Sequence, residues 1–269
     1  MRAKTSLLLL VGVCATSIGC RTTLEYSYWQ PDFSSVQQTS GDPALDMDSQ
    51  LGVVTDENVV VYDLIGDAGR NRCRIDYWKV HGEGAVVVPT GPGFMFDGDN
   101  YLGDENVETV MDLEAVGILW EPALIKVDGF RLRIAVGLDL IRFAMTVEDL
   151  GPVNPGLTGT VEVPGPDGPL SGMGLDHMPV PKLGLSFEAD MTPWIRIHAR
   201  AQMFDASYLD LDDRFSGTFT NAVGGLVFGK HRGIRAFVGY RYFNADYDFD
   251  GDSGNSTLQG LLGSVSLRF

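Results

Sequence analysis

The sequence has few cysteines, few basic residues and no long apolar run after its first twenty positions. Its three cysteines form neither a disulfide framework nor a CxxC metal signature, so no metal ion is predicted. The formal net charge of −16 argues against nucleic acid as a partner, because phosphate binding needs a basic surface. A helical membrane protein is excluded because no apolar run approaches about 18 residues. No cofactor is predicted.

The N-terminus has the pattern of a secretion signal. Two basic residues precede an apolar stretch at 7–13, and the small-residue exit Ser17-Ile-Gly-Cys20 follows. The exit resembles a bacterial lipoprotein signal, in which the cysteine is lipidated, although Ser17 stands where that motif usually has Leu. We therefore predict a signal peptide over 1–19, lipidation at Cys20 and one domain over 20–269. Ordinary cleavage nearby, with Cys20 lost or left free, is the alternative.

Apolar and polar residues alternate with period two through much of the chain. In 182–191 the odd positions are apolar and the even ones polar or small, and 195–203, 234–242 and 132–140 alternate in the same way. Such segments form strands with one apolar and one polar face. Several of them exceed the roughly 5–6 residues of a soluble strand and reach the roughly 9–11 of a membrane-spanning one. Near Arg142 the alternation slips, which predicts a bulge.

The connections between these strands alternate in length. Tight turns at 126–129, 192–193 and 230–233 alternate with acidic or Gly/Pro-rich loops at 89–104, 149–177 and 246–256. Short turns on one side and long loops on the other are typical of outer-membrane barrels, whose short turns are periplasmic. We predict an all-β, antiparallel up-and-down transmembrane barrel with both termini in the periplasm.

The number of strands follows from reading backwards from the C-terminus. Eight strands fall near 256–269, 233–248, 213–229, 194–208, 178–191, 129–147, 104–121 and 70–82, and two weaker candidates lie at 45–54 and 23–33. The prediction is ten strands, or eight if the two weaker segments are not barrel strands.

The last residues, Leu261 to Phe269, have apolar residues or glycine at alternate positions and end on an aromatic. This resembles the C-terminal strand of Gram-negative outer-membrane barrels, whose terminal aromatic is read by the barrel assembly machinery. With Gly239 to Phe243, the pattern is similar to small barrels of the OmpA-like and OmpW-like superfamily. The resemblance implies outer-membrane lipids and the assembly machinery as partners, with lipopolysaccharide a further candidate. It carries over no catalytic residue, because such barrels differ in function.

One face of the predicted strands carries charged residues that would line a lumen. These predicted lumen residues are Arg131, Arg133, Asp139, Glu188, Asp190, Arg196, His198, Arg200, Arg235 and Arg241. A barrel of about eight to ten strands has a narrow interior that side chains largely fill. Unpaired charges there are costly, so Arg–carboxylate pairs are expected. Trp120 and Trp194, beside predicted turns, are expected to anchor at the membrane interface.

His198 raises an enzymatic alternative. Some small barrels modify lipopolysaccharide with a His, a Ser and an acid, and Ser186 and Glu188 lie on the strand before His198. However, His198 shares its face with Arg196 and Arg200, which favours a role inside the lumen. We expect a structural or surface-exposed role in the outer membrane. A narrow channel for small solutes, a lipid A-modifying enzyme and a soluble periplasmic β-barrel lipoprotein are the alternatives.

Overall fold

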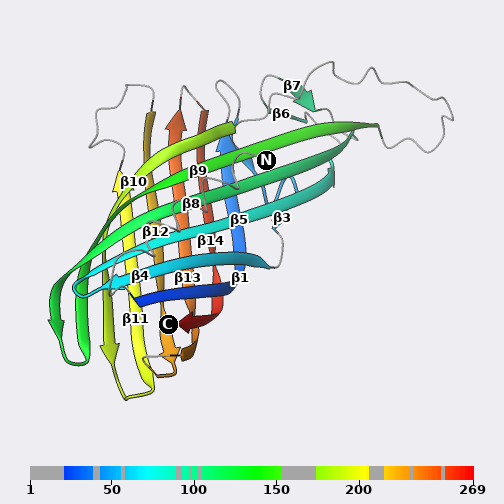
Figure 1. Ribbon diagram of the computed structural model, residues 1–269. Coiled ribbons are helices and arrows are strands. Elements are labelled where there is room, and N and C mark those ends of the chain that lie inside the picture. Colours follow the sequence, from blue (N-terminus) through cyan, green and yellow to red (C-terminus); the bar gives the residue numbers. More distant parts are fainter. Residues whose placement is uncertain are drawn as a thin grey trace, which may run out of the picture.

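Ten antiparallel strands close into one barrel in the computed structural model (Figure 1). The structure describes residues 21–38, 43–55, 58–88, 93–96, 99–101, 105–152, 174–205, 215–230, 233–249 and 252–269. The ring consists of β1 (Arg21–Gln38), β4 (Val59–Ala68), β5 (Asn71–Val87), β8 (Glu105–Val127), β9 (Phe130–Pro152), β10 (Gly174–Asp190), β11 (Ile195–Asp205), β12 (Phe215–Phe228), β13 (Gly233–Phe249) and β14 (Asp252–Arg268). Successive ring strands pair, and β14 returns to pair with β1, which closes the ring. The predicted ten-stranded barrel is confirmed.

Four tight turns of the ring lie at one end: β4–β5, β8–β9, β10–β11 and β12–β13. Figure 1 shows the β8–β9, β10–β11 and β12–β13 connections at the lower end, where the C-terminus also lies. The β4–β5 turn at Gly69 and the β8–β9 turn at Gly129 need positive φ, 64° and 74°, which glycine adopts without steric cost. The strand ends that border the longer connections lie at the opposite end, but so do the ends of β13 and β14, which pair at Phe249 and Asp252 with two residues between them. The predicted alternation of short and long connections is therefore confirmed except at 246–256, where strand residues stand in place of the predicted loop.

The first part of the ring differs from its prediction. The segment 45–54 is not a ring strand: it holds only β2 (Leu45–Asp46), which pairs with β1, and the first residue of β3 (Val54–Thr55), which pairs with β5. The ring strand is β4, which the sequence analysis missed because Val59 to Tyr62 is an unbroken apolar run without alternation. A separate pair, β6 (Phe94–Phe96) and β7 (Asp99–Tyr101), lies off the ring.

The outer wall of the barrel changes from apolar to polar part-way along its strands. On β9, β8 and β5 the change falls between two adjacent rows of paired residues: Leu140, Val116 and Tyr77, then Arg142, Glu114 and Lys79. On β1, β13 and β14 the last outward apolar residues before polar ones are Tyr28, Tyr242 and Leu261. We call the part on the tight-turn side of this boundary the lower tier, and the part on the loop side the upper tier.

The interior changes in the opposite sense at the same boundary. On β9, the inward side chains are Arg133 and Asp139 in the lower tier and Phe143, Met145 and Val147 in the upper tier. The interior of the upper tier is thus a hydrophobic core, to which the segment between β1 and β4 adds four side chains, each no more than 2% exposed: Leu45, Met47, Leu51 and Val53.

The predicted bulge near Arg142 is wrong for β9. Its odd positions from 131 to 147 all face inward, and its pairing with β8 runs without a shift from Glu148 to Val136. The alternation slips in the sequence because the apolar side chains move from the outer face to the inner face. A register shift does occur opposite this point, on β10 between Leu175 and Met178.

The lower tier has the dimensions of a membrane-spanning wall. On β9 it runs over residues 130–140, which at about 3.3 Å per residue and a tilt of roughly 40° spans about 28 Å. The apolar band of an outer-membrane barrel is about 25 Å tall. No helix in the described part of the chain is long and apolar enough to cross a bilayer.

Candidate functional site

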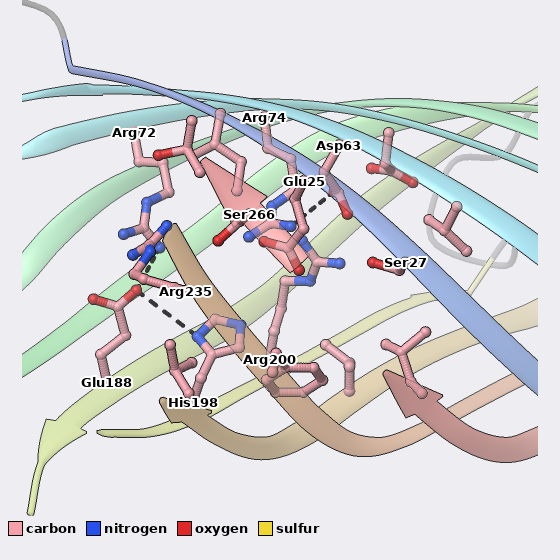
Figure 2. Close-up of a pocket in the computed structure, with 18 of the residues that line it drawn as sticks. Glu25, Ser27, Asp63, Arg72, Arg74, Glu188, His198, Arg200, Arg235 and Ser266 are labelled. Carbon is pink, nitrogen blue, oxygen red and sulfur yellow. Dashed lines mark hydrogen bonds and ion pairs between the residues drawn. The ribbon is translucent and has the colours of Figure 1, made fainter. Parts of the chain in front are cut away.

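Charged side chains from many strands converge inside the lower tier, and we call them the lumen network. Figure 2 shows them approaching from β1, β4, β5, β10, β11 and β13 around a central space, which Ser266 of β14 also lines. That cavity has a volume of about 70 Å³. Since one water needs roughly 10–15 Å³ on this measure, the cavity holds only a few water-sized groups.

Glu188 is the main acceptor of the network. Its Oε1 accepts a hydrogen bond from Arg72 Nη1 at 2.7 Å, and its side chain is 8% exposed. Four other basic side chains place a nitrogen 3.5–4.0 Å from its carboxylate: Arg131, Arg133, Arg196 and His198. The positive charge of the surrounding arginines offsets the cost of burying this carboxylate, and removing one partner of such a group is strongly destabilising.

Two further aspartates near the tight turns bind arginines of the network. Arg74 Nη1 lies 2.7 Å from Asp63 Oδ1. Asp67 accepts from both Arg72 Nε at 3.0 Å and Arg268 Nη2 at 2.8 Å. These pairs join β4, β5 and β14 across the point where the ring closes.

Gly117 allows two other carboxylates to approach each other. A Cβ at this position would lie 2.5 Å from Asp139 Oδ1 and 2.6 Å from Asp76 Oδ1, so any other residue would displace them. Lys182 Nζ forms an ion pair with Asp139 Oδ1 and provides the compensating charge. Glycine is required here for close packing.

The predicted lumen residues all lie on the inward face of the lower tier. Six of them are no more than 9% exposed: Arg133, Asp139, Glu188, Arg196, Arg200 and Arg241. Arg131 and Asp190 are at the tight-turn rim, where their side chains are 28% exposed. Arg235 and His198 line the cavity.

The predicted membrane and assembly residues face outward. Trp120 and Trp194 are 50% and 55% exposed, and Lys230 Nζ lies 4.7 Å from the Trp194 ring centre. Phe269 is 63% exposed, while its backbone N–H donates to Thr22 O. Cys20 and the predicted signal peptide lie outside the described residues.

The sequence analysis missed part of the network on β4 and β5. Arg72, Arg74 and Asp76 alternate with outward residues just as the predicted set does, and this signal was available. It was overlooked because the strand before them was misplaced. Asp63 and Asp67 were hidden for the same reason.

The three residues of the enzymatic alternative do not form a hydrogen-bonded relay. His198 Nδ1 is 3.8 Å from Glu188 Oε1, too far for a hydrogen bond. The buried Ser186 Oγ has no hydrogen-bond partner among the described residues, whereas an activated serine needs an adjacent base. His198 instead packs edge-on against Phe237, with ring centres 6.3 Å apart.

A second polar cluster lies on the outer wall of the upper tier. His81 Nε2 lies 2.9 Å from Glu83 Oε1, and His81 Nδ1 lies 2.9 Å from Asp112 Oδ1. These hydrogen bonds, first that to Glu83 and then that to Asp112, raise the pKa of His81 above its usual value. Lys79 Nζ also binds Asp112, at 2.8 Å. In the described residues, no group of three His, Cys, Asp or Glu side chains is placed to hold a metal ion.

Comparison with known proteins shows the fold. The sequence matches no family model and no curated protein. The outer membrane protease OmpT from Escherichia coli is similar in structure, with 7% identity, a TM-score of 0.57, and 94% of this chain and 99% of that chain covered. The translocator domain of the autotransporter NalP from Neisseria meningitidis is similar over 100% of this chain and 95% of its own, with 13% identity and a TM-score of 0.44. The likeness to OmpT establishes an outer-membrane barrel fold, whereas the narrower OmpA-like or OmpW-like assignment stays a prediction.

Proposed function

We propose that this chain is an outer-membrane barrel with a structural or surface-exposed role and a lumen that does not conduct. The outward side chains of the lower tier support the membrane location, since large apolar residues such as Leu183, Leu261 and Ile234 are 63%, 63% and 72% exposed. Soluble monomers rarely expose contiguous apolar surface of this extent.

The orientation follows from the tight turns. Outer-membrane barrels place their short turns in the periplasm, so the upper tier would project from the cell surface. Its polar outer wall suits water rather than lipid. In this arrangement both termini are periplasmic, a lipid on Cys20 would sit in the inner leaflet, and Phe269 is exposed for the barrel assembly machinery.

The filled interior of the upper tier is the observation that carries the non-conducting role. Trp29 and Trp78 are 0% exposed and meet edge to face at 6.0 Å, and Phe243 meets Trp78 at 5.1 Å. Together with the segment between β1 and β4, they close the barrel above the lumen network. A closed barrel whose upper tier stands above the membrane is suited to a structural or surface role.

Conductance in planar bilayers tests this proposal. The purified protein should give no unitary current steps, because the described side chains of the upper tier fill its interior. The runner-up is a narrow channel for small solutes. Current steps that disappear when Arg196 and Arg200 are both changed to Gln would establish the channel and overturn the closed barrel.

Cell fractionation separates the membrane barrel from a soluble periplasmic lipoprotein. The expected result is recovery in the outer membrane together with a heat-dependent shift in gel mobility. Recovery in the soluble fraction without such a shift would refute the membrane location. The lipid A-modifying alternative predicts altered lipopolysaccharide acylation on expression, abolished by His198→Ala.

A further inference from the structure

We propose that the lower-tier cavity binds a small oxyanion, which enters from the tight-turn end. Six arginines and five carboxylates line the cavity. With His198 neutral its lining is therefore net positive, inside a chain whose formal charge is −16. The interior of this acidic protein thus concentrates positive charge, which favours the binding of an anion.

Most of the lining carboxylates already have partners. Asp63 and Asp67 bind arginines, Glu188 is the hub of the network, and Glu25 accepts a hydrogen bond from Ser264 at 2.8 Å. The remaining one, Asp76, interacts electrostatically with Lys182 first and then with Arg200 and Arg241. Next to the lining, the buried Glu121 adds a carboxylate 3.8 Å from Arg72. Arg131 and Arg133 add two guanidinium groups, each 3.5 Å from Glu188, so the arginines still outnumber the carboxylates.

Three lining arginines form no ion pair within 4.0 Å among the described residues: Arg200, Arg235 and Arg241. Arg200 is 8% exposed, and its Nη1 has no hydrogen-bond partner in the described part of the chain. Arg235 Nε is unpartnered in the same way. Figure 2 shows Arg200 extending from β11 into the space between Glu25 and Arg74. A planar guanidinium offers paired N–H donors that match the geometry of a phosphate or carboxylate.

Arg241 forms the roof of the cavity. Its guanidinium carbon lies 4.8 Å from the Trp29 ring centre and 5.0 Å from the Trp78 ring centre. These cation–π contacts hold the side chain without neutralising its charge. The same indoles belong to the hydrophobic core above, so the cavity is closed on the loop side.

The cavity can be approached from the tight-turn end. A groove at the rim, lined by residues 126–131 together with Asp190, shares Glu188 and Arg196 with the cavity. An anion would therefore enter along this groove, past Arg196. A volume of about 70 Å³ corresponds to roughly five water-sized groups, which suits orthophosphate or a short carboxylate and excludes a nucleotide.

Calorimetry with orthophosphate tests the site. The full-length protein in detergent micelles is titrated with sodium phosphate at constant ionic strength, and saturable binding at one site is expected. Arg200→Gln should weaken binding at least tenfold. Arg142→Gln, the same substitution on the exposed outer wall, should leave the affinity unchanged. No saturable binding, or equal weakening by both variants, would overturn the proposal.

Other anions identify the ligand class. Competition by acetate would support the oxyanion site and point to a carboxylate as the natural ligand, and phosphate binding without such competition would point to a phosphate. Equal competition by chloride would mean a general halide site and would contradict the proposal. Arg200→Lys keeps the positive charge but lacks the paired N–H donors of a guanidinium. This variant should therefore fold, and it should bind phosphate several-fold more weakly than the unmodified protein.

A labelling experiment tests the site with every arginine in place. Ser266 lines the cavity, and Ala245 lies in the upper core. Each is changed to Cys in a protein that carries Cys73→Ser. The Cys73→Ser protein without a new cysteine gives the background rate of labelling. At Ser266→Cys an anionic thiosulfonate should react faster than a cationic one, and phosphate should slow it. Ala245→Cys should not react. The anion site would be refuted if the cationic reagent reacted faster at Ser266→Cys, or if phosphate did not slow the reaction. This result would be independent of whether the barrel conducts.

Discussion

The lower and upper tiers use the same strands with opposite polarity. In β9, Leu138 and Leu140 face outward around the inward Asp139, and a few residues further on Arg142 faces outward beside the inward Phe143. The ring crosses this boundary without interruption. The difference teaches that the solvent outside each tier, rather than the barrel itself, determines which face is apolar.

The two interiors are stabilised by different interactions. The lower interior depends on ion pairs such as Arg72–Glu188, which are sensitive to the loss of one partner. The upper interior depends on close packing of large side chains, which is sensitive to cavities. A substitution should therefore have a different effect in each tier, and three predictions test this.

Truncation in the upper core should have the largest effect. Trp78→Ala removes an indole that is 0% exposed and leaves a cavity, so the free energy of unfolding should fall by about 3–5 kcal/mol. Urea unfolding in lipid vesicles, followed by tryptophan fluorescence and gel mobility, measures it.

Trp120→Ala is the matched control, because this indole faces outward in the lower tier and is 50% exposed. Lipid chains fill the space that the substitution leaves, so no cavity forms and the loss should be clearly smaller. Equal losses in the two variants would mean that the upper interior is not a packed core.

A charge on the outer wall should distinguish the tiers next. Leu185→Arg, near the middle of the lower tier, places a guanidinium against lipid and should reduce the free energy of unfolding by about 2–4 kcal/mol. Thr146→Arg, on the exposed outer wall of the upper tier, faces water and should change it by no more than about 0.5 kcal/mol. The same unfolding measurement applies, and similar costs at both positions would place the membrane boundary elsewhere.

The same polarity exchange explains what could be predicted from the sequence. Residues 182–191 and 195–203 lie almost wholly in the lower tier, where the alternation is regular, and their strands and inward faces were predicted. On β9 the exchange at Arg142 looked like a bulge, because a change of solvent and a shift of register produce the same slip in the pattern.

The start of the ring was harder for a related reason. β4 holds the inward Val59 and Val61 next to the outward Val60, so both faces are apolar where the tiers meet. The segment with Leu45, Met47 and Leu51 alternates except at Ser49, yet it packs into the core through a turn. Alternation reports which side chains are buried, and it does not report whether the backbone belongs to the ring.

The arginine excess of the cavity could not be predicted for a different reason. Alternation placed Arg200 and Arg241 on the inward face, but their partners lie on strands distant in sequence. Whether a buried arginine meets a carboxylate or an indole depends on strand order and stagger. Those follow from closure of the whole ring, including the strand that was missed.

The smallest effect is expected from the polar cluster on the upper outer wall. Hydrogen bonds to Glu83 and Asp112 raise the pKa of His81, so an NMR titration should give a value above about 6.5. Because the folded pKa is raised, the stabilisation is fully present below the unfolded pKa and is lost as pH rises through the folded pKa. The His81 side chain is 33% exposed, so solvent screens the interaction and the change in stability should be slight.

Glu83→Gln should lower the pKa of His81, whereas Glu148→Gln, on the same wall, should leave it unchanged. An unshifted His81 in the unmodified protein would mean that the cluster does not form in water, and that the upper tier is not exposed as its polarity indicates.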